Sequence, residues 1–173
     1  MLGTRGERPL SSLSTPHRLS GPCQALIVRT ATELFAKGWW FNEEKTTLTP
    51  NPTDKNIYIA NDALGLKNHA VTVVKRGSRL YDLEKGTYEH TSPIECTLVR
   101  FLPLEHLPET AAAYLAAEAV FRFQRDYDGD STKTRQLLAE RNQAKIEAVS
   151  EEIRMRKYNA IDTNATIQRF QRR

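Results

Sequence analysis

The chain has 173 residues, 39% of them hydrophobic and 27% charged, which is typical of one globular protein with a rather polar surface. No apolar run is long enough to span a bilayer. The polar N-terminus lacks the apolar segment of a secretory signal, which predicts synthesis and folding in a cytoplasm. Cys23 and Cys96 are far apart and no histidine stands at ligand spacing from either. We therefore expect two free thiols, no metal and no cofactor.

The net charge of +4 is unevenly distributed along the chain. Residues 38–129 carry ten Lys or Arg against thirteen acids, whereas residues 130–173 carry ten against six. A basic C-terminal arm favours contact with nucleic acid or with an acidic partner surface. The simpler interpretation is a solvated helix face, and the charge alone leaves both open.

Residues 1–20 are rich in Ser, Pro, Arg and Gly and are predicted to form a loop or an extended arm. Ser20-Gly21-Pro22 is a helix-start signal, and apolar residues then recur at helical spacing. Lys37 and Gly38 have the residue types that end helices. We expect a helix over about 21–37.

The middle of the chain has the pattern of short strands. Strands are expected over 39–49, 57–59, 70–74, 79–83 and 94–102, with 61–68 as a loop. Turns at Pro50-Asn51-Pro52, Arg76-Gly77-Ser78 and Lys85-Gly86 separate most of them. This predicts an antiparallel β-meander of about five strands.

Two helices follow the strands. Pro108 and Glu109 start the first, which ends near Gly129. Asp130-Ser131 caps the second, over about 131–160. Its apolar stripe is thin for such a long helix, which predicts a neighbour within the chain or in another subunit. The stripe consists of Leu137, Leu138, Ala144, Ala148, Val149, Ile153 and Met155.

Together these elements predict an α+β fold. We expect a helical bundle of about three helices with an inserted antiparallel β-meander domain and an extended C-terminal helix and tail. The expected boundaries are 1–37 and 103–160 for the helical domain, 38–102 for the β domain and 161–173 for the C-terminal tail.

Acidic residues suggest two kinds of chemistry. The acidic stretch Asp126–Asp130 is similar to the start of an EF-hand calcium-binding loop. Its glycine, Gly129, comes too early, however, and Leu137 stands where the loop needs a bidentate Glu, so no calcium site is expected. Glu43 and Glu44 are adjacent and would point to opposite faces of a strand, which disfavours joint action on one glycosidic bond. A pair formed by Glu43 with Asp82 or Glu95 stays open.

Several stretches, in order, resemble the tail tubular protein A family, the head-to-tail adaptors of short-tailed bacteriophages. They are "RGERPLSSL", "AKGWWFNEEKTTLTP", "VVKRGSRLYDLEKGTYE" and "TLVRFLPLEHLPETAAAYLAAEAVFRFQRDYDGD". Together they cover roughly residues 3–145.

The resemblance implies a viral structural protein of the podovirus virion tail, assembled in the host bacterial cytoplasm, and not an enzyme. Family members form a twelve-subunit ring between the portal protein and the tail nozzle, tubular protein B. The ring lines the channel for DNA ejection and helps to anchor tail fibres. Genomic DNA is expected to pass through the channel without specific binding, because a channel wall that bound phosphates tightly would slow the exit of the DNA. We therefore expect the acidic middle of the chain to supply much of the outer and channel surface.

The residue assignments combine the resemblance with the local pattern. Gly38, Trp39, Phe41, Tyr81 and Pro108 are expected to be structural, with Trp39 and Phe41 on one face and Asn42 bonded to the local backbone. The family pattern does not demand Trp40, which is therefore expected at a subunit contact. The basic arm is expected to dock on the portal or a neighbouring subunit through Arg154, Arg156, Lys157, Arg169, Arg172 and Arg173.

Two other functions remain as alternatives. One is a tail-associated polysaccharide hydrolase that would use Glu43, Glu44, Asp82 and Glu95. The other is a nucleic-acid-binding protein acting through the basic C-terminus. Against the latter, Tyr158 and Phe170 are the only aromatic residues interleaved with that basic segment.

Overall fold

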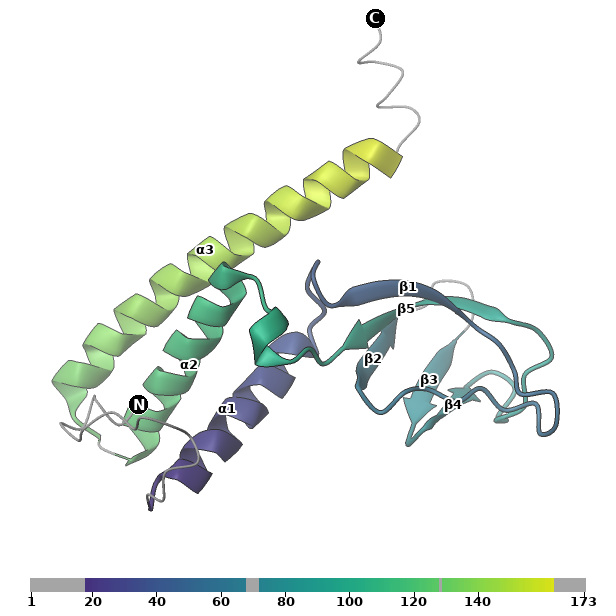
Figure 1. Ribbon diagram of the computed structural model, residues 1–173, viewed down its shortest axis with the longest axis horizontal. Coiled ribbons are helices and arrows are strands. Elements are labelled where there is room, and N and C mark those ends of the chain that lie inside the picture. The colour runs from purple at the N-terminus through teal and green to yellow at the C-terminus, as the bar shows by residue number, and fades with distance from the viewer. Residues whose placement is uncertain (1–17, 68–71, 128, 164–173) are drawn as a thin grey trace, which may run out of the picture. The chain divides into compact units, whose positions relative to one another are not determined.

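The structure is a computed structural model that describes residues 18–67, 72–127 and 129–163, with side chains described as far as Arg156. The described residues form three α-helices, α1 (Ser20–Phe35), α2 (Glu109–Tyr127) and α3 (Ser131–Thr163). They also form the 3-10 helix η2 (Leu104–His106) and five strands, β1 (Glu43–Leu48), β2 (Ala63–Lys67), β3 (Val73–Arg76), β4 (Arg79–Asp82) and β5 (Ile94–Arg100) (Figure 1). The predicted α+β class with a long C-terminal helix is confirmed.

The chain divides into two compact units, Met1–Ala31 with Leu107–Arg173, and Thr32–His106. We call them the helical unit and the β unit. In the helical unit, Leu19, Cys23 and Leu26 pack against Phe123 of α2, which is fully buried. This apolar cluster holds α1 against α2.

Local sequence signals set the first residues of both α2 and α3. The Pro108 carbonyl accepts a hydrogen bond from the Ala112 amide at 2.9 Å, so Pro108 stands directly before the first helical residue. Asp130 Oδ1 accepts hydrogen bonds from the amides of Thr132 at 2.9 Å and Lys133 at 3.1 Å. Asp130 is therefore the N-cap of α3, as predicted.

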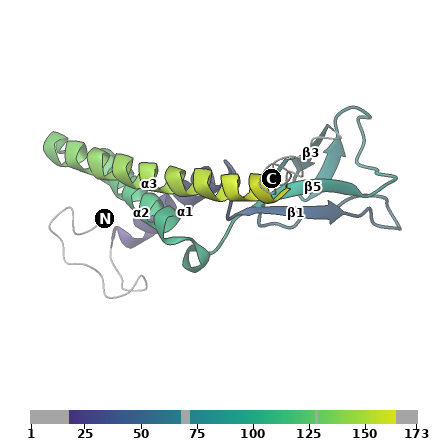
Figure 2. The ribbon, with the colours of Figure 1, turned by 90° about the horizontal axis from the view of Figure 1, so that it is seen from above.

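The helices α2 and α3 form an antiparallel pair. Thr110 near the start of α2 donates a hydrogen bond to Glu151, and Glu118 further along α2 pairs with Arg141. Because α2 begins at Glu109, α3 continues for several turns past it towards Thr163. Figure 1 and Figure 2 both show α3 lying along α2 and extending beyond it.

The β unit holds two antiparallel sheets. In the three-stranded sheet, β5 lies between β1 and β2, with Glu43 opposite Val99 and Lys67 opposite Thr97. In the two-stranded sheet, β3 and β4 form the predicted hairpin. The strand order differs from a meander, in which strands that follow one another in sequence are neighbours.

The structure corrects three local predictions in the β unit. Ala63–Lys67, within the segment expected as a loop, forms β2. The expected strand over 57–59 is an extended segment with isolated bridges at Asn56 and Tyr58. The expected strand over 39–49 begins only at Glu43. Pairing with β5 makes Ala63–Lys67 a strand, and a turn at residues 39–42 delays the start of β1; sequence periodicity reports neither.

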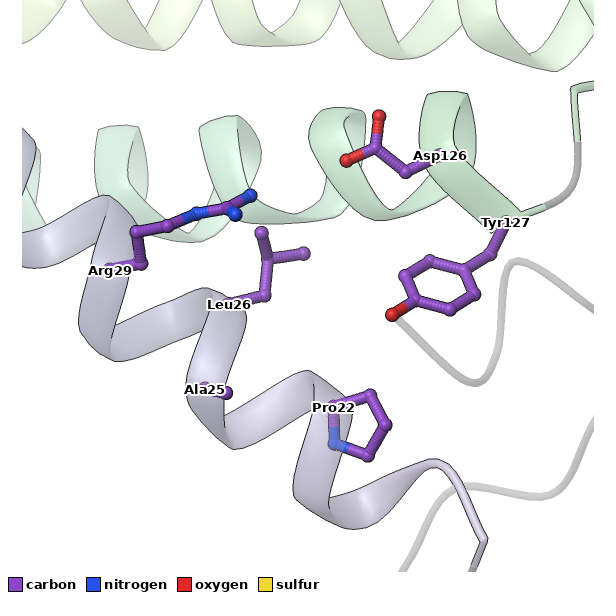
Figure 3. Close-up of a pocket in the computed structure, with 6 residues that line it drawn as sticks. All are labelled: Pro22, Ala25, Leu26, Arg29, Asp126 and Tyr127. Atoms are coloured by element: carbon purple, nitrogen blue, oxygen red, sulfur yellow. The ribbon is translucent and has the colours of Figure 1, made fainter.

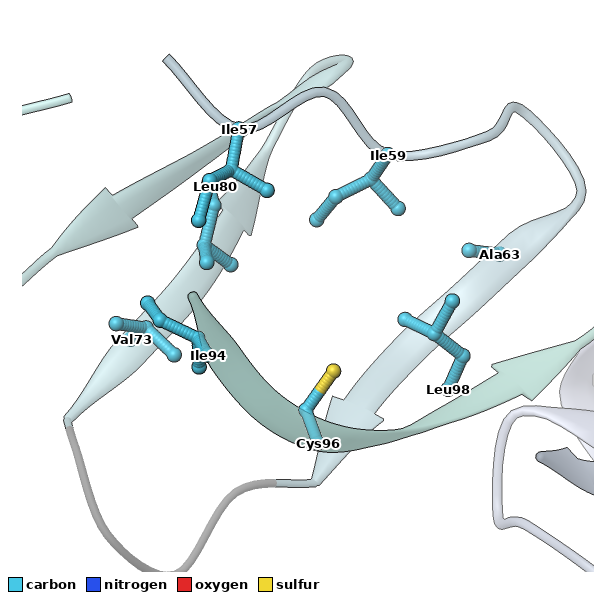
Figure 4. Packing of buried hydrophobic residues seen from close by; sticks show 8 residues of the cluster. All are labelled: Ile57, Ile59, Ala63, Val73, Leu80, Ile94, Cys96 and Leu98. Carbon is cyan, nitrogen blue, oxygen red and sulfur yellow. The ribbon is translucent and has the colours of Figure 1, made fainter. Parts of the chain in front are cut away.

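Side chains from both sheets and from the segment between β1 and β2 form one core (Figure 4). Leu80 of β4 is fully buried, and Ile57 and Ile59 point inward beside it. The alternate residues Ile94, Cys96 and Leu98 of β5 complete the cluster, as their period of two predicts. Cys96 and Cys23 are both free and buried, which confirms the two predicted thiols.

Candidate assembly surfaces

The segment that follows α1 is a tight turn. Gly38 has φ of 74°, and its amide donates a hydrogen bond to the Phe35 carbonyl at 2.9 Å. A Cβ at this position would lie 2.6 Å from both Glu43 Oε1 and Lys67 Nζ, which pair with each other. The backbone angle favours glycine here, and a larger residue would also require the flexible ends of this ion pair to shift.

The buried side chain of Asn42 stabilises this turn through hydrogen bonds to the backbone. The residue is 3% exposed, and its Oδ1 accepts a hydrogen bond from the Trp39 amide at 2.7 Å. Its Nδ2 donates to the carbonyls of Phe35 at 3.1 Å and Arg100 at 2.8 Å. One amide side chain therefore joins the end of α1 to the end of β5, which agrees with its expected bonding to local backbone.

The two tryptophans lie in this turn and both are half-buried. Trp39 donates its Nε1 hydrogen to the Leu34 carbonyl at 2.9 Å and stacks on Phe41, with ring centroids 6.1 Å apart. Trp40 meets the edge of the same Phe41 ring at 5.9 Å. Because residues 39–42 form a turn and not a strand, the expected alternation of faces does not apply to them.

Tyr81 lies in a cluster of two tyrosines that are flanked by two arginines. The Arg76 guanidinium lies 3.7 Å from the centre of the Tyr81 ring, and Tyr81 meets Tyr88 at 4.8 Å. The Arg79 guanidinium lies 4.3 Å from the centre of the Tyr88 ring. The β3–β4 register makes Arg76 and Tyr81 diagonal neighbours, and sequence reasoning missed this pairing.

The four carboxylates considered for hydrolysis do not converge. Glu43 pairs with Lys67, and Glu44 pairs with Arg100. Asp82 is buried and accepts hydrogen bonds from the amides of the following turn, and the bond from the Lys85 amide lowers its pKa most. Glu95 is exposed opposite Thr47. The first three carboxylates therefore support local structure.

The predicted basic arm is described only in part. Arg154 and Arg156 are exposed on α3, and Arg156 pairs with Glu152 one turn earlier. Lys157 lies within α3, but its side chain is outside the described part of the structure. Arg169, Arg172 and Arg173 lie outside the described residues.

Glu118 is a buried carboxylate at the α2–α3 contact. It accepts hydrogen bonds from Arg122 Nε at 2.7 Å and Arg141 Nε at 2.6 Å. Burial alone would raise the pKa of Glu118, but the bonds from Arg141 and Arg122 outweigh it and hold the pKa below its ordinary value. The ion triad fixes the register of the two helices.

An open groove lies between α1 and the C-terminal end of α2 (Figure 3). Its volume is about 630 Å³, and its described lining combines apolar side chains with one basic and one acidic residue. We call it the helical groove; its lining residues are Pro22, Ala25, Leu26, Arg29, Asp126 and Tyr127.

In residues 18–67, 72–127 and 129–163, no three His, Cys, Asp or Glu side chains are gathered as metal ligands. None of the helices in that part of the chain is long and apolar enough to cross a membrane.

The sequence is similar to known proteins over most of its length. The family model described as tail tubular protein matches residues 1–158, which include α1, all five strands, α2 and most of α3. Tail tubular protein A of Klebsiella phage KP34 is 29% identical over 130 residues, which cover 73% of this chain and 69% of that protein.

Proposed function

This chain belongs to the tail tubular protein family, and we propose that it acts as a head-to-tail adaptor within the phage tail. Family membership makes it a structural component of a bacteriophage tail, located in the virion and assembled with other tail proteins. The finer proposal is a ring of twelve subunits between the portal protein and the tail nozzle.

The observation that supports a ring is the length of α3. Its contacts with α2 reach Glu151, near the start of α2, while the helix continues to Thr163. Most helix stability in proteins comes from tertiary contacts, so the turns of α3 past the start of α2 would be stabilised by a further packing surface. A neighbouring subunit would supply that partner, and a head-to-tail contact closes into a ring when its rotation permits.

Other tail components are the proposed partners of the remaining surfaces. We assign the basic arm, Arg154 to Arg173, to the portal or a neighbouring subunit, and Trp40 to a subunit contact. The nozzle, tubular protein B, and the tail fibres would bind elsewhere on the ring. We keep the domain boundaries expected from the sequence, 1–37 with 103–160, 38–102 and 161–173, as part of this proposal.

Genomic DNA is proposed to pass through the ring without specific binding. Tight binding to phosphates would slow its exit, so a channel wall needs weak or repulsive charge. The ion pairs Glu43–Lys67 and Glu44–Arg100 keep cations of the β unit neutralised, which suits such a wall. The structural character of the family and the dispersed carboxylates support a protein without enzymatic activity.

The test is electron microscopy of the chain co-expressed with the portal protein of its phage. We expect a twelve-fold ring at the narrow end of the portal. A chain that stays monomeric and unattached in the presence of the portal would overturn the adaptor assignment. Tight binding of duplex DNA at physiological salt would contradict the proposed channel wall.

A further inference from the structure

One side of the long helix α3 packs against α2, and apolar residues are also exposed on the opposite side. Leu138, Ile146 and Ile153 are 38%, 59% and 49% exposed. At 100° per residue, these three side chains lie within an arc of roughly 80° around the helix axis. Arg141 and Glu151, which contact α2, mark the opposite side of the helix: the middle of the arc lies about 140° from the midpoint between them. We call these three residues the outer stripe.

This division corrects the single apolar stripe expected for the helix. Ala148 is 3% exposed and lies on the side of α3 that faces α2, whereas Leu138 and Ile153 lie on the other side. Ile146, the most exposed of the outer residues, was not part of the expected stripe. Exposed apolar residues aligned on one helix face are typical of a binding surface.

The helical groove has the properties of a receptor for such a face. Its volume of about 630 Å³ holds several aliphatic side chains. Figure 3 shows Pro22, Ala25 and Leu26 on one side and Tyr127 on the other, with Arg29 and Asp126 above them. Tyr127 is 45% exposed, so its ring is available to an incoming apolar side chain.

The charges around the two surfaces are complementary. Ile146 stands between Lys145 and Glu147, which project to opposite sides of it on the exposed surface of α3. At the groove, Asp126 forms an ion pair with Arg125, and Arg29 lines the same groove. In one orientation of the contact, Glu147 would face these arginines and Lys145 would face Asp126.

We propose that the outer stripe of one copy of this chain binds the helical groove of the next copy. The inference rests on the ring proposed above and identifies the contact that builds it. Stripe and groove are different surfaces of one helical unit, so their contact is head-to-tail and can propagate around a ring. A stripe-to-stripe contact would be self-complementary and would stop at a dimer.

Two variants test this contact. Ile146→Glu places a charge in the outer stripe, and Ala25→Arg fills the groove and can pair with Asp126. Both positions are exposed, so far-UV circular dichroism and the thermal unfolding midpoint should match the wild type. Gln136→Glu is the matched control, because it adds the same charge at an exposed position of α3 away from the stripe.

Size-exclusion chromatography with light scattering gives the masses. We expect the wild type and the control to form multi-subunit species and each variant alone to be monomeric. An equimolar mixture of the two variants should give a one-to-one dimer and nothing larger, because only one functional stripe and one functional groove remain. If the wild type assembles only on the portal, rings are scored there by electron microscopy, and neither variant should form one.

Each other outcome overturns the inference in a recognisable way. Assembly by both variants would refute the contact while leaving the proposed ring intact. Dimers of the groove variant alone would indicate a stripe-to-stripe contact. A mixture that stays monomeric would mean that stripe and groove do not bind each other. A wild type that assembles neither alone nor on the portal would refute the ring as well.

Discussion

Replacing Glu118 with Gln should destabilise the helical unit while preserving the shape of the side chain. The Glu118 side chain is 5% exposed and accepts hydrogen bonds from Arg122 on its own helix and Arg141 on α3. The variant keeps one oxygen acceptor but loses the negative charge that both guanidinium groups share. It therefore weakens the link between α2 and α3 without creating a cavity.

The exposure of the two arginines decides how much unfolding free energy the Glu118→Gln substitution should remove. A hydrogen bond to a charged group contributes about 1.5–3 kcal/mol, and breaking a fully buried ion pair costs about 3–5 kcal/mol. The side chains of Arg122 and Arg141 are 20% and 24% exposed, so water can solvate them in the variant. We therefore expect a loss of about 2–3 kcal/mol in the free energy of unfolding at neutral pH.

The loss should depend on pH in a defined direction. The pKa of Glu118 in the folded protein lies below its ordinary value of 4.5, so folding favours the charged carboxylate. Its contribution to stability is complete above pH 4.5 and is lost as the pH falls through the lower, folded-state pKa. The Gln variant has no such group, so the difference between the two proteins should shrink below pH 4.5.

Urea unfolding followed by the helical circular dichroism signal measures this difference at neutral and acidic pH. The control is Glu140→Gln, which makes the same change at an exposed position of α3 and should stay within about 0.5 kcal/mol of the wild type. A Glu118 variant as stable as that control, or a difference unchanged by acid, would refute the role assigned to the ion triad.

Three further substitutions test other parts of the fold. Asn42→Ala removes the three hydrogen bonds of this buried side chain and should lower the unfolding free energy by about 2–4 kcal/mol, measured by urea titration with tryptophan fluorescence; a loss below about 1 kcal/mol would contradict the bridging role. Gly38→Ala forces a Cβ against the Glu43 carboxylate at positive φ and should cost about 1–2 kcal/mol in the same assay, whereas an unchanged midpoint would mean that the turn adapts. Phe123→Ala empties the centre of the α1–α2 contact and should cost about 3–5 kcal/mol by chemical denaturation. It should also accelerate thiol labelling of Cys23, and a Cys23 that stays protected would show that the cluster closes over the cavity.

Sequence reasoning predicted the helices well because their ends depend on neighbouring residues. Asp130 caps α3 with bonds to amides two and three residues away, and Pro108 and Gly38 act within one turn of their own helices. Such signals are complete within a short window of sequence. The helix after Gly21 was expected to reach 37, and it ends at Phe35 because the turn that holds Gly38 begins earlier.

The β unit was harder to predict because its strands depend on distant partners. Ala63–Lys67 contains Gly65 and no β-branched residue, so nothing local marks it as a strand, yet it pairs with β5. The segment at Trp39 carries aromatic residues that favour strands, but the hydrogen bonds of Asn42 hold it as a turn. In both places tertiary contacts override local propensity.

The candidate surfaces were predicted only in outline. A thin stripe on α3 indicated a missing neighbour, but the sequence did not show which apolar residues α2 would cover. The Arg76–Tyr81 stack and the Glu118–Arg141 pair join residues whose distance in space depends on the register of a hairpin and of two helices. Register is a property of the folded pair, and a single sequence reports it weakly.

Hydrogen exchange in the part of α3 beyond Glu151 should indicate whether a subunit has assembled. From there to Thr163 the helix rises about 18 Å, at 1.5 Å per residue, past the start of α2. Helix turns that extend past a packing partner exchange their amide hydrogens with deuterated water faster than packed turns do, and we expect this of the segment in a single copy. Packing against a neighbour would slow that exchange over this segment alone. Deuterium uptake along one helix would then reveal when a subunit has joined its ring.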